Sequence, residues 1–278
     1  MELSPQSRIK VIGRGRVGAA FAARLNERGV LAEDGDADLV LLCVPDSAIA
    51  TVAAGFPTGP WIAHVSGGTP LAALAPHSRR FSVHPLQTFT RSRGAEQIDG
   101  AWAAVSAETS EARAAGWTLA QSLGLRAFDL ADDRRAIYHA GASIASNFLV
   151  TIHRAAVRAV GAAGAPPEAL LPLMRRTIDN GFELTGPIER GDWETVEAHR
   201  EAIRSTRPDL EPLYDVLARA TESYARVEEE GGNREVPPTE VLAEGEAVLE
   251  EEGGPRGKHG FPRGSEPKAS DLPTATRS

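Results

Sequence analysis

Short apolar segments of four to six residues recur through the first half of the chain. The segment at residues 39–44 is apolar throughout and stops at Pro45, which is typical of a strand buried on both faces of a parallel sheet. After the first segment, Val17, Phe21 and Leu25 recur at helical spacing. Strands that alternate with helices predict a layered α/β fold. The predicted strands lie at residues 8–12, 39–44, 61–65, 81–84, 101–106 and 126–130, with a helix at 110–123.

From Asp132 onward the strand-like segments cease and only helical spacing continues. A long helix is predicted to begin with Asp132 as its N-cap and to end near residue 163, before Gly-Ala-Pro-Pro. Further helices are predicted up to about residue 180, with Gly181 as C-cap, and at 193–205 and 209–227. The pattern therefore predicts an α/β domain at residues 1–131 and an all-α domain at 132–227.

Residues 228–278 combine acidic runs, Gly-Gly pairs and prolines with few large apolar residues. Such a segment buries too little apolar surface to offset its ordering entropy, so we predict a disordered acidic tail. It holds twelve acidic and six basic residues, and therefore most of the formal charge of −8. The rest of the chain is nearly neutral and has no basic stripe, which argues against nucleic acid as a partner.

Several features favour a cytoplasmic protein. Cys43 is the only cysteine, which excludes an intramolecular disulfide and fits a reducing compartment. Residues 1–5 lack the basic and apolar regions of a secretory signal, and no apolar run approaches the roughly 18 residues of a membrane helix. We therefore expect no membrane partner.

The histidines show no metal-ligand spacing, so no metal site is expected either.

A glycine-rich segment stands between the first predicted strand and the first predicted helix. In a dinucleotide-binding fold, the first glycine of such a segment makes a tight turn and the second admits a pyrophosphate to the backbone N–H groups. The third glycine lets the helix pack on the strand. An alternative is a glycine-rich turn without a ligand. The residues predicted to bind NAD or NADP are Gly13, Arg14, Gly15, Arg16, Val17 and Gly18, the two arginines either contacting phosphate or remaining solvated.

A Rossmann-type domain continues with a second strand, and here that strand is predicted to be shortened or missing. Only residues 30–32 could form it, and the six residues from Glu33 to Asp38 are too short for a parallel crossover. Glu33 is the single candidate for a carboxylate that binds the ribose of the cofactor.

Several further sequence blocks carry a family resemblance. They are Val44-Pro45-Asp46, Ser66-Gly67-Gly68, His84-Pro85-Leu86-Gln87-Thr88-Phe89, Tyr138-His139-Ala140, Ser146-Asn147-Phe148-Leu149, and residues 184–192 (LTGPIERGD). With the glycine-rich segment, they resemble bacterial proteins that pair a Rossmann-like domain with a helical domain of unknown function, among the 6-phosphogluconate-dehydrogenase-like reductases. The resemblance implies an NAD(P)-dependent oxidoreductase, often a homodimer built on the helical domain. Some relatives resemble alternative ketopantoate reductases.

The predicted cofactor route follows the carboxyl ends of the strands, past Val44, Pro45 and Asp46 and then Ser66 and Gly67. His84 ends the next predicted strand, and an imidazole suits proton exchange at neutral pH. The alternative role is a turn histidine fixed by Pro85.

His139, Ser143 and Asn147 are spaced i, i+4, i+8 and form a polar stripe on the long helix, beside an apolar stripe predicted to face the core. In the related β-hydroxyacid dehydrogenases, a lysine and an asparagine one turn apart hold and protonate the carbonyl. No lysine occurs here, since Ser143 precedes Asn147 by one turn. We predict His84, His139 and Asn147 as catalytic residues in the cleft between the domains; an inert polar face is the alternative.

Thr185, Arg190 and Asp192 lie in a predicted turn between two helices. Thr185, Arg190 and Ser143 are predicted to bind a small-molecule substrate, with Arg190 pairing with its carboxylate, whereas Asp192 is predicted to cap a helix. Three hypotheses follow: a reductase of a small oxo acid, a dinucleotide-binding or regulatory protein without turnover, and a structural assembly domain.

Overall fold

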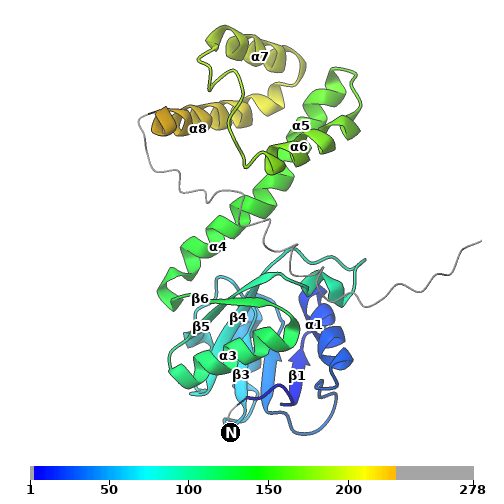
Figure 1. Ribbon diagram of the computed structural model, residues 1–278, viewed down its shortest axis with the longest axis vertical. Coiled ribbons are helices and arrows are strands. Elements are labelled where there is room, and N and C mark those ends of the chain that lie inside the picture. The colour runs from blue at the N-terminus through cyan, green and yellow to red at the C-terminus, as the bar shows by residue number, and fades with distance from the viewer. Residues whose placement is uncertain (1–2, 230–278) are drawn as a thin grey trace, which may run out of the picture. The chain divides into compact units, whose positions relative to one another are not determined.

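The computed structural model describes residues 3–229, and Figure 1 shows their helices and strands. The chain divides after Arg158 into two compact units. No helix among the described residues is long and apolar enough to cross a membrane.

The first unit is built on one six-stranded sheet whose strands lie in chain order. All neighbouring strands are parallel except β4 and β5, which are antiparallel. The α/β Rossmann-type prediction is therefore confirmed. The strands are β1 (Ile9–Ile12), β2 (Leu39–Leu42), β3 (Trp61–His64), β4 (Arg80–Leu86), β5 (Trp102–Ala107) and β6 (Arg126–Asp129).

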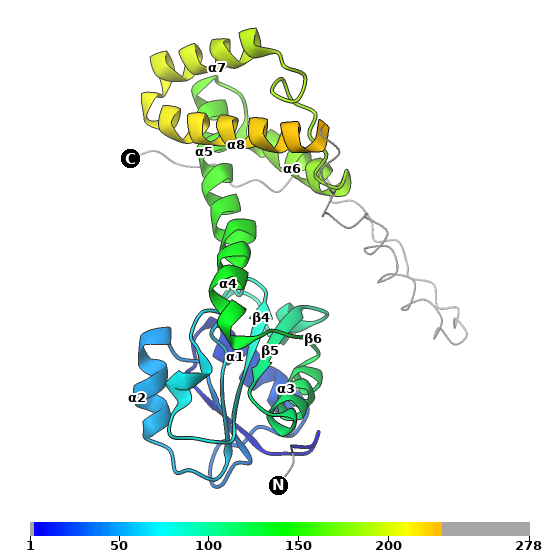
Figure 2. The ribbon, with the colours of Figure 1, turned by 90° about the vertical axis from the view of Figure 1, so that its left-hand side faces the viewer.

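Helices cover both faces of the sheet, as Figure 2 shows. Leu39 and Leu41 of β2 pack in the larger core beneath α1 (Arg16–Glu27) and α3 (Ser110–Leu123). The alternate residues Val40 and Leu42 pack on the other face, against α2 (Ile49–Ala54) and the 3₁₀ turn η2 (Leu71–Leu74). Because β2 is buried on both faces, it requires the unbroken apolar run seen in its sequence.

The shortened second strand is present as a single bridge. Leu31 pairs in parallel with Ile9 at the outer edge of β1. The Ile9 N–H donates to the Val30 carbonyl, and the Ala32 N–H donates to the Ile9 carbonyl, both at 2.9 Å. The chain then turns back to β2 without a crossover helix, in keeping with the short connection.

The prediction that His84 ends its strand is wrong. β4 runs on to Leu86, because residues beyond Ser82 keep pairing with the antiparallel neighbour β5. β3, however, pairs with β4 only as far as His64 and Ser82. His84 therefore lies on the part of β4 that extends past the carboxyl end of β3.

The predicted long helix is present as consecutive helical segments, and a π-helical turn interrupts the α-helical hydrogen bonding inside it. The turn η4 (Asp132–Arg134) leads into α4 (Arg135–Ser143), a π-helical turn η5 (Ile144–Phe148) and α5 (Leu149–Ala162). Asp132 is not the predicted cap, because its carboxylate accepts the N–H of Leu71 at 3.1 and 3.2 Å. The predicted apolar stripe does not face a core, since Ile137 is 71% exposed and Phe148 is 56% exposed.

The second unit contains three further helices in the described part of the chain, α6 (Leu170–Asp179), α7 (Trp193–Thr206) and α8 (Glu211–Glu229). Asp192 caps α7 as predicted, because its carboxylate accepts the Thr195 N–H at 3.1 Å. An ion pair between Arg200 and Asp215 at 2.9 Å joins α7 to α8. Apart from the last two residues of α8, the predicted tail at 228–278 lies outside the described residues.

Candidate active site

The glycine loop between β1 and α1 is held by close backbone packing. Gly13 has a φ of +98°, and a Cβ there would lie 2.4 Å from the carbonyl oxygen of Cys43. A Cβ on Gly18 would lie 1.9 Å from the Gly13 carbonyl oxygen. Both contacts are too short for any side chain, so these two glycines are required by the fold itself.

Gly15 differs from these two because the space around it is open. Its φ is −70°, which any residue can adopt, and apart from its chain neighbours no atom of the described residues lies within 4 Å of a Cβ built on it. Gly15 is the N-cap of α1 and has no side chain to accept from the first N–H groups of that helix. Free N–H groups beside an unobstructed backbone fit the phosphates of a dinucleotide.

Arg14 and Glu33 meet beside this loop. The Arg14 Nη2 atom lies 3.1 and 3.3 Å from the two carboxylate oxygens of Glu33, and both side chains are exposed. Arg14 is therefore ion-paired rather than simply solvated. Cys43, on the strand side of the loop, is partly buried, and burial raises the pKa of its thiol to about 12, which makes it a poor nucleophile.

A cavity of about 760 Å³ opens beside the start of α1. A volume of this size is ordinary for a small-molecule site. Three segments of the first unit form its wall: the beginning of α1, residues 84–89 at the end of β4, and residues 137–147 of α4 and η5. The cavity brings together six of the residues predicted from the sequence: Arg16, Val17, His84, His139, Ser143 and Asn147.

Two imidazole rings and a phenol form the polar centre of this cavity. His84 Nδ1 lies 2.8 Å from the hydroxyl oxygen of Tyr138. The rings of His84 and His139 are nearly perpendicular, with centroids 5.7 Å apart. Both partners come from the first turns of α4, while His84 comes from β4.

The two imidazoles differ in exposure, since His84 is partly buried and the ring of His139 is exposed. Burial, together with the charges of His139 and Arg135, lowers the pKa of His84 to about 4, against the opposing effect of Asp46. Burial likewise raises the pKa of Tyr138 to about 12. His84 is therefore neutral at pH 7.

The lowered pKa of His84 predicts acid-sensitive stability. Since the unfolded chain binds the proton at about pH 6.5 and the folded chain at about pH 4, the free energy of unfolding is expected to fall as pH drops from about 6.5 to about 4. Urea unfolding at a series of pH values measures this slope. His84→Gln should make this slope shallower but not remove it, because the lowered pKa of His64 contributes to it as well. His199→Gln is the control, and equal slopes in both variants would contradict the assignment.

The other predicted cofactor residues lie at the ends of β2 and β3, next to the cavity but outside its wall. The Ser66 hydroxyl lies 2.8 Å from the Asp46 carboxylate. Gly67 packs against both imidazoles, since a Cβ there would lie 2.8 Å from His84 Nε2 and from His139 Cδ2. Val44 and Pro45 link β2 to the turn that begins with Asp46.

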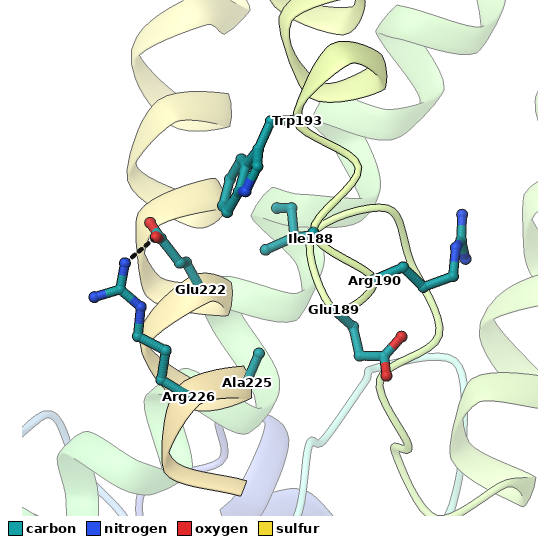
Figure 3. Close-up of a pocket in the computed structure, with 8 residues that line it drawn as sticks. Ile188, Glu189, Arg190, Trp193, Glu222, Ala225 and Arg226 are labelled. Carbon is teal, nitrogen blue, oxygen red and sulfur yellow. Dashed lines mark hydrogen bonds and ion pairs between the residues drawn. The ribbon is translucent and has the colours of Figure 1, made fainter. Parts of the chain in front are cut away.

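Thr185 and Arg190 belong to the second unit. The Arg190 Nη1 atom donates to the Thr185 carbonyl at 2.7 Å. Arg190 also lines a hollow of about 390 Å³ with Trp193 and an ion pair between Glu222 and Arg226. In Figure 3 its guanidinium points away from that ion pair.

Sequence reasoning missed Tyr138 and Arg135 as parts of the site. A sequence signal existed, because Arg135, Tyr138 and His139 stand at i, i+3 and i+4 and therefore share one face of α4. Nothing in the helical spacing indicated that Tyr138 would reach His84 on a strand 54 positions earlier in the sequence.

Comparison with known proteins supports the architecture. Residues 101–221 match the family described as a domain of unknown function, DUF2520. No curated protein matches the chain. The prediction of a Rossmann-like domain followed by a helical domain of unknown function is confirmed by this match and by solved structures.

Three of these structures illustrate the likeness. A provisionally assigned NADP oxidoreductase from Bacteroides fragilis is 21% identical with a TM-score of 0.65, over 79% of this chain and 99% of that one. Protein TM1727 from Thermotoga maritima is 25% identical with a TM-score of 0.65, over 80% and 99%. A reductive aminase from Aspergillus terreus in complex with NADPH and ethyl levulinate is 18% identical with a TM-score of 0.55, over 78% and 94%.

Proposed function

We propose that this protein is a cytoplasmic NAD(P)H-dependent oxidoreductase that reduces a small oxo acid. One observation carries the proposal: a single cavity joins the start of α1 to His84, His139 and Asn147. The solved structures with the same fold include an NADPH complex of a reductive aminase, which is in keeping with a dinucleotide at this loop.

The glycine loop fits the cofactor for a physical reason. Gly15 leaves the backbone open, and the uncapped N–H groups of α1 favour an anion. Arg16 lines the cavity beside them, where its charge attracts phosphate. When bound, the dinucleotide supplies the hydride for the reduction.

The remaining chemistry belongs to the side chains of the cavity. Reduction of a carbonyl requires a proton donor for the oxygen. We assign this role to His139, whose exposed ring lines the cavity, because partly buried His84 is neutral at pH 7. The Asn147 amide orients the carbonyl oxygen, and Ser143 lies one helical turn before it to bind the substrate.

For Arg190 and Thr185, which belong to the second unit, binding of a carboxylate stays a prediction from the sequence. A guanidinium binds a carboxylate through two parallel hydrogen bonds. One of the Arg190 nitrogens is already directed to the Thr185 carbonyl, which limits the rotation of the side chain. Among oxo acids, ketopantoate is the most specific candidate, from the family resemblance.

A dinucleotide-binding protein without turnover is the second candidate. Two observations favour it: the second strand is reduced to one bridge, and serine stands where the related dehydrogenases have lysine. Titration of NADPH and NADH, followed by their oxidation with a panel of 2-oxo acids, separates the candidates. Binding with oxidation supports the reductase, binding alone supports the second candidate, and no binding contradicts both.

We also propose a homodimer. Ile137 on α4 and both Ile144 and Phe148 on η5 are each more than half exposed, and large exposed apolar patches mark interaction surfaces. We expect a sedimentation mass of twice the 29.5-kDa chain at micromolar concentration. Phe148→Glu should shift the mass toward one chain, whereas Lys10→Glu should not. A mass of one chain for the unaltered protein would contradict the proposal.

A further inference from the structure

Arg135 is a fully buried arginine at the first position of α4, with a side chain that does not line the cavity. Burying a guanidinium is costly unless its N–H groups are bonded. Here Nε donates to the Thr69 carbonyl at 2.8 Å, and Nη2 donates to the Ser66 carbonyl at 2.6 Å. Nη1 donates to the hydroxyls of Ser82 on β4 and Ser106 on β5, at 2.7 and 2.8 Å.

These bonds determine the position of one short segment. Ser66 and Thr69 flank Gly67 and Gly68, and their two carbonyls are held by the same guanidinium. Gly67 touches both imidazoles, and a Cβ on Gly68 would lie 3.2 Å from His139 Nδ1. Any movement of this segment would therefore change the contacts of the rings.

The same side chain also fixes the helix that carries the other half of the site. Tyr138 and His139 follow Arg135 by three and four residues, and so stand one turn later on the same face of α4. By binding Ser82 on β4 as well, Arg135 ties this turn to the strand that carries His84.

We propose that Arg135 is a positioning residue of this site: it holds the Gly67–Gly68 segment and the first turn of α4 against His84, and thereby fixes the contacts of the two imidazole rings. The inference rests on the proposed function for its catalytic meaning, but its structural content does not depend on turnover.

The charged and titratable groups that act on His84 come from three elements. Arg135, Tyr138 and His139 face it from α4, Asp46 from the turn after β2, and His64 from β3. Of these, Arg135 and His139 favour the neutral form of His84, and Asp46 opposes them. Arg135 also favours the neutral form of His64, whose pKa burial lowers to about 3.

The test is the titration of the histidine side chains by NMR in the full-length protein, with His84 and His139 assigned from their glutamine variants. Arg135→Met removes the charge and keeps the apolar stem. We expect the His84 midpoint to rise by about one pH unit toward the ordinary value, since a neighbouring charge shifts a pKa by roughly 1–3 units. Arg80→Met, on the same strand as His84 but paired with Glu108, is the matched control and should leave the midpoint unchanged.

Arg135→Lys keeps the charge but cannot bond both carbonyls in the same geometry. This variant should leave the His84 midpoint low while accelerating amide hydrogen exchange at Gly67 and Gly68. It also provides the test of the proposal if Arg135→Met does not fold. An unchanged His84 midpoint in folded Arg135→Met, or unchanged exchange in Arg135→Lys, would overturn the proposal. Failure of the proposed function is distinguishable, because it shows as no NAD(P)H oxidation by a protein whose His84 responds as expected.

Discussion

Replacing His139 by alanine is expected to lower kcat by about 10²–10⁴, the usual effect of losing a general acid. His84→Ala should cost less, because the partly buried ring is neutral at pH 7 and lacks the acidic proton of an imidazolium. Steady-state rates of NAD(P)H oxidation at pH 7 measure both losses.

The matched control is His199→Gln, which removes an imidazole bonded to Tyr214 in the second unit. Its kcat should stay close to that of the unaltered protein. A larger loss in His84→Ala than in His139→Ala would assign the acid to His84 and contradict the role of burial proposed for the pair.

Substituting Gly15 by valine is expected to abolish dinucleotide binding without unfolding the protein. The space around Gly15 is open and its φ is ordinary, so the fold accepts a side chain. The valine side chain would occupy the space that the pyrophosphate of the dinucleotide requires. We expect Kd for NADPH or NADH to rise by about 100-fold or more, equivalent to about 2.7 kcal/mol.

Two comparisons make the Gly15 test specific. Gly59→Val, at a site with equally open space far along the chain from the loop, should leave the Kd unchanged. Gly18→Val should instead lower the melting temperature, because its Cβ would collide with the Gly13 backbone. Unchanged affinity in a folded Gly15→Val protein would show that the glycine loop is not the cofactor site.

The strands and most helices could be predicted because each is encoded locally. The apolar run at 39–44 predicted a doubly buried strand, which the structure has at Leu39–Leu42, and α3 begins and ends at the predicted residues 110 and 123. Asp192 capped α7 for the same reason, since a cap depends only on its own first turn. The predictions that were wrong concern features that depend on distant residues. Pairing with β5 extends β4 past the predicted end at His84, and the Asp132 carboxylate accepts the N–H of Leu71 and does not cap its own helix.

The candidate site shows the same division. His84, His139 and Asn147 could be selected as residues of suitable chemistry, and the structure brings them to one cavity. The π-helical turn that carries Asn147 has no signature in the apolar spacing, and it changes the phase of the helix at the cavity. The burial that makes His84 neutral, and the Arg135 network behind it, arise from packing between segments that are far apart in the sequence.

Deuterium transfer tests the proposed reaction most directly. The protein is incubated with NADPH or NADH deuterated at the transferable position and with the panel of 2-oxo acids, and the products are examined by mass spectrometry. The account predicts a 2-hydroxy acid with one deuterium on the carbon that bore the carbonyl, and much less of it from His139→Ala. A protein that binds the dinucleotide but yields no deuterated product from any of the acids would contradict the proposed reduction.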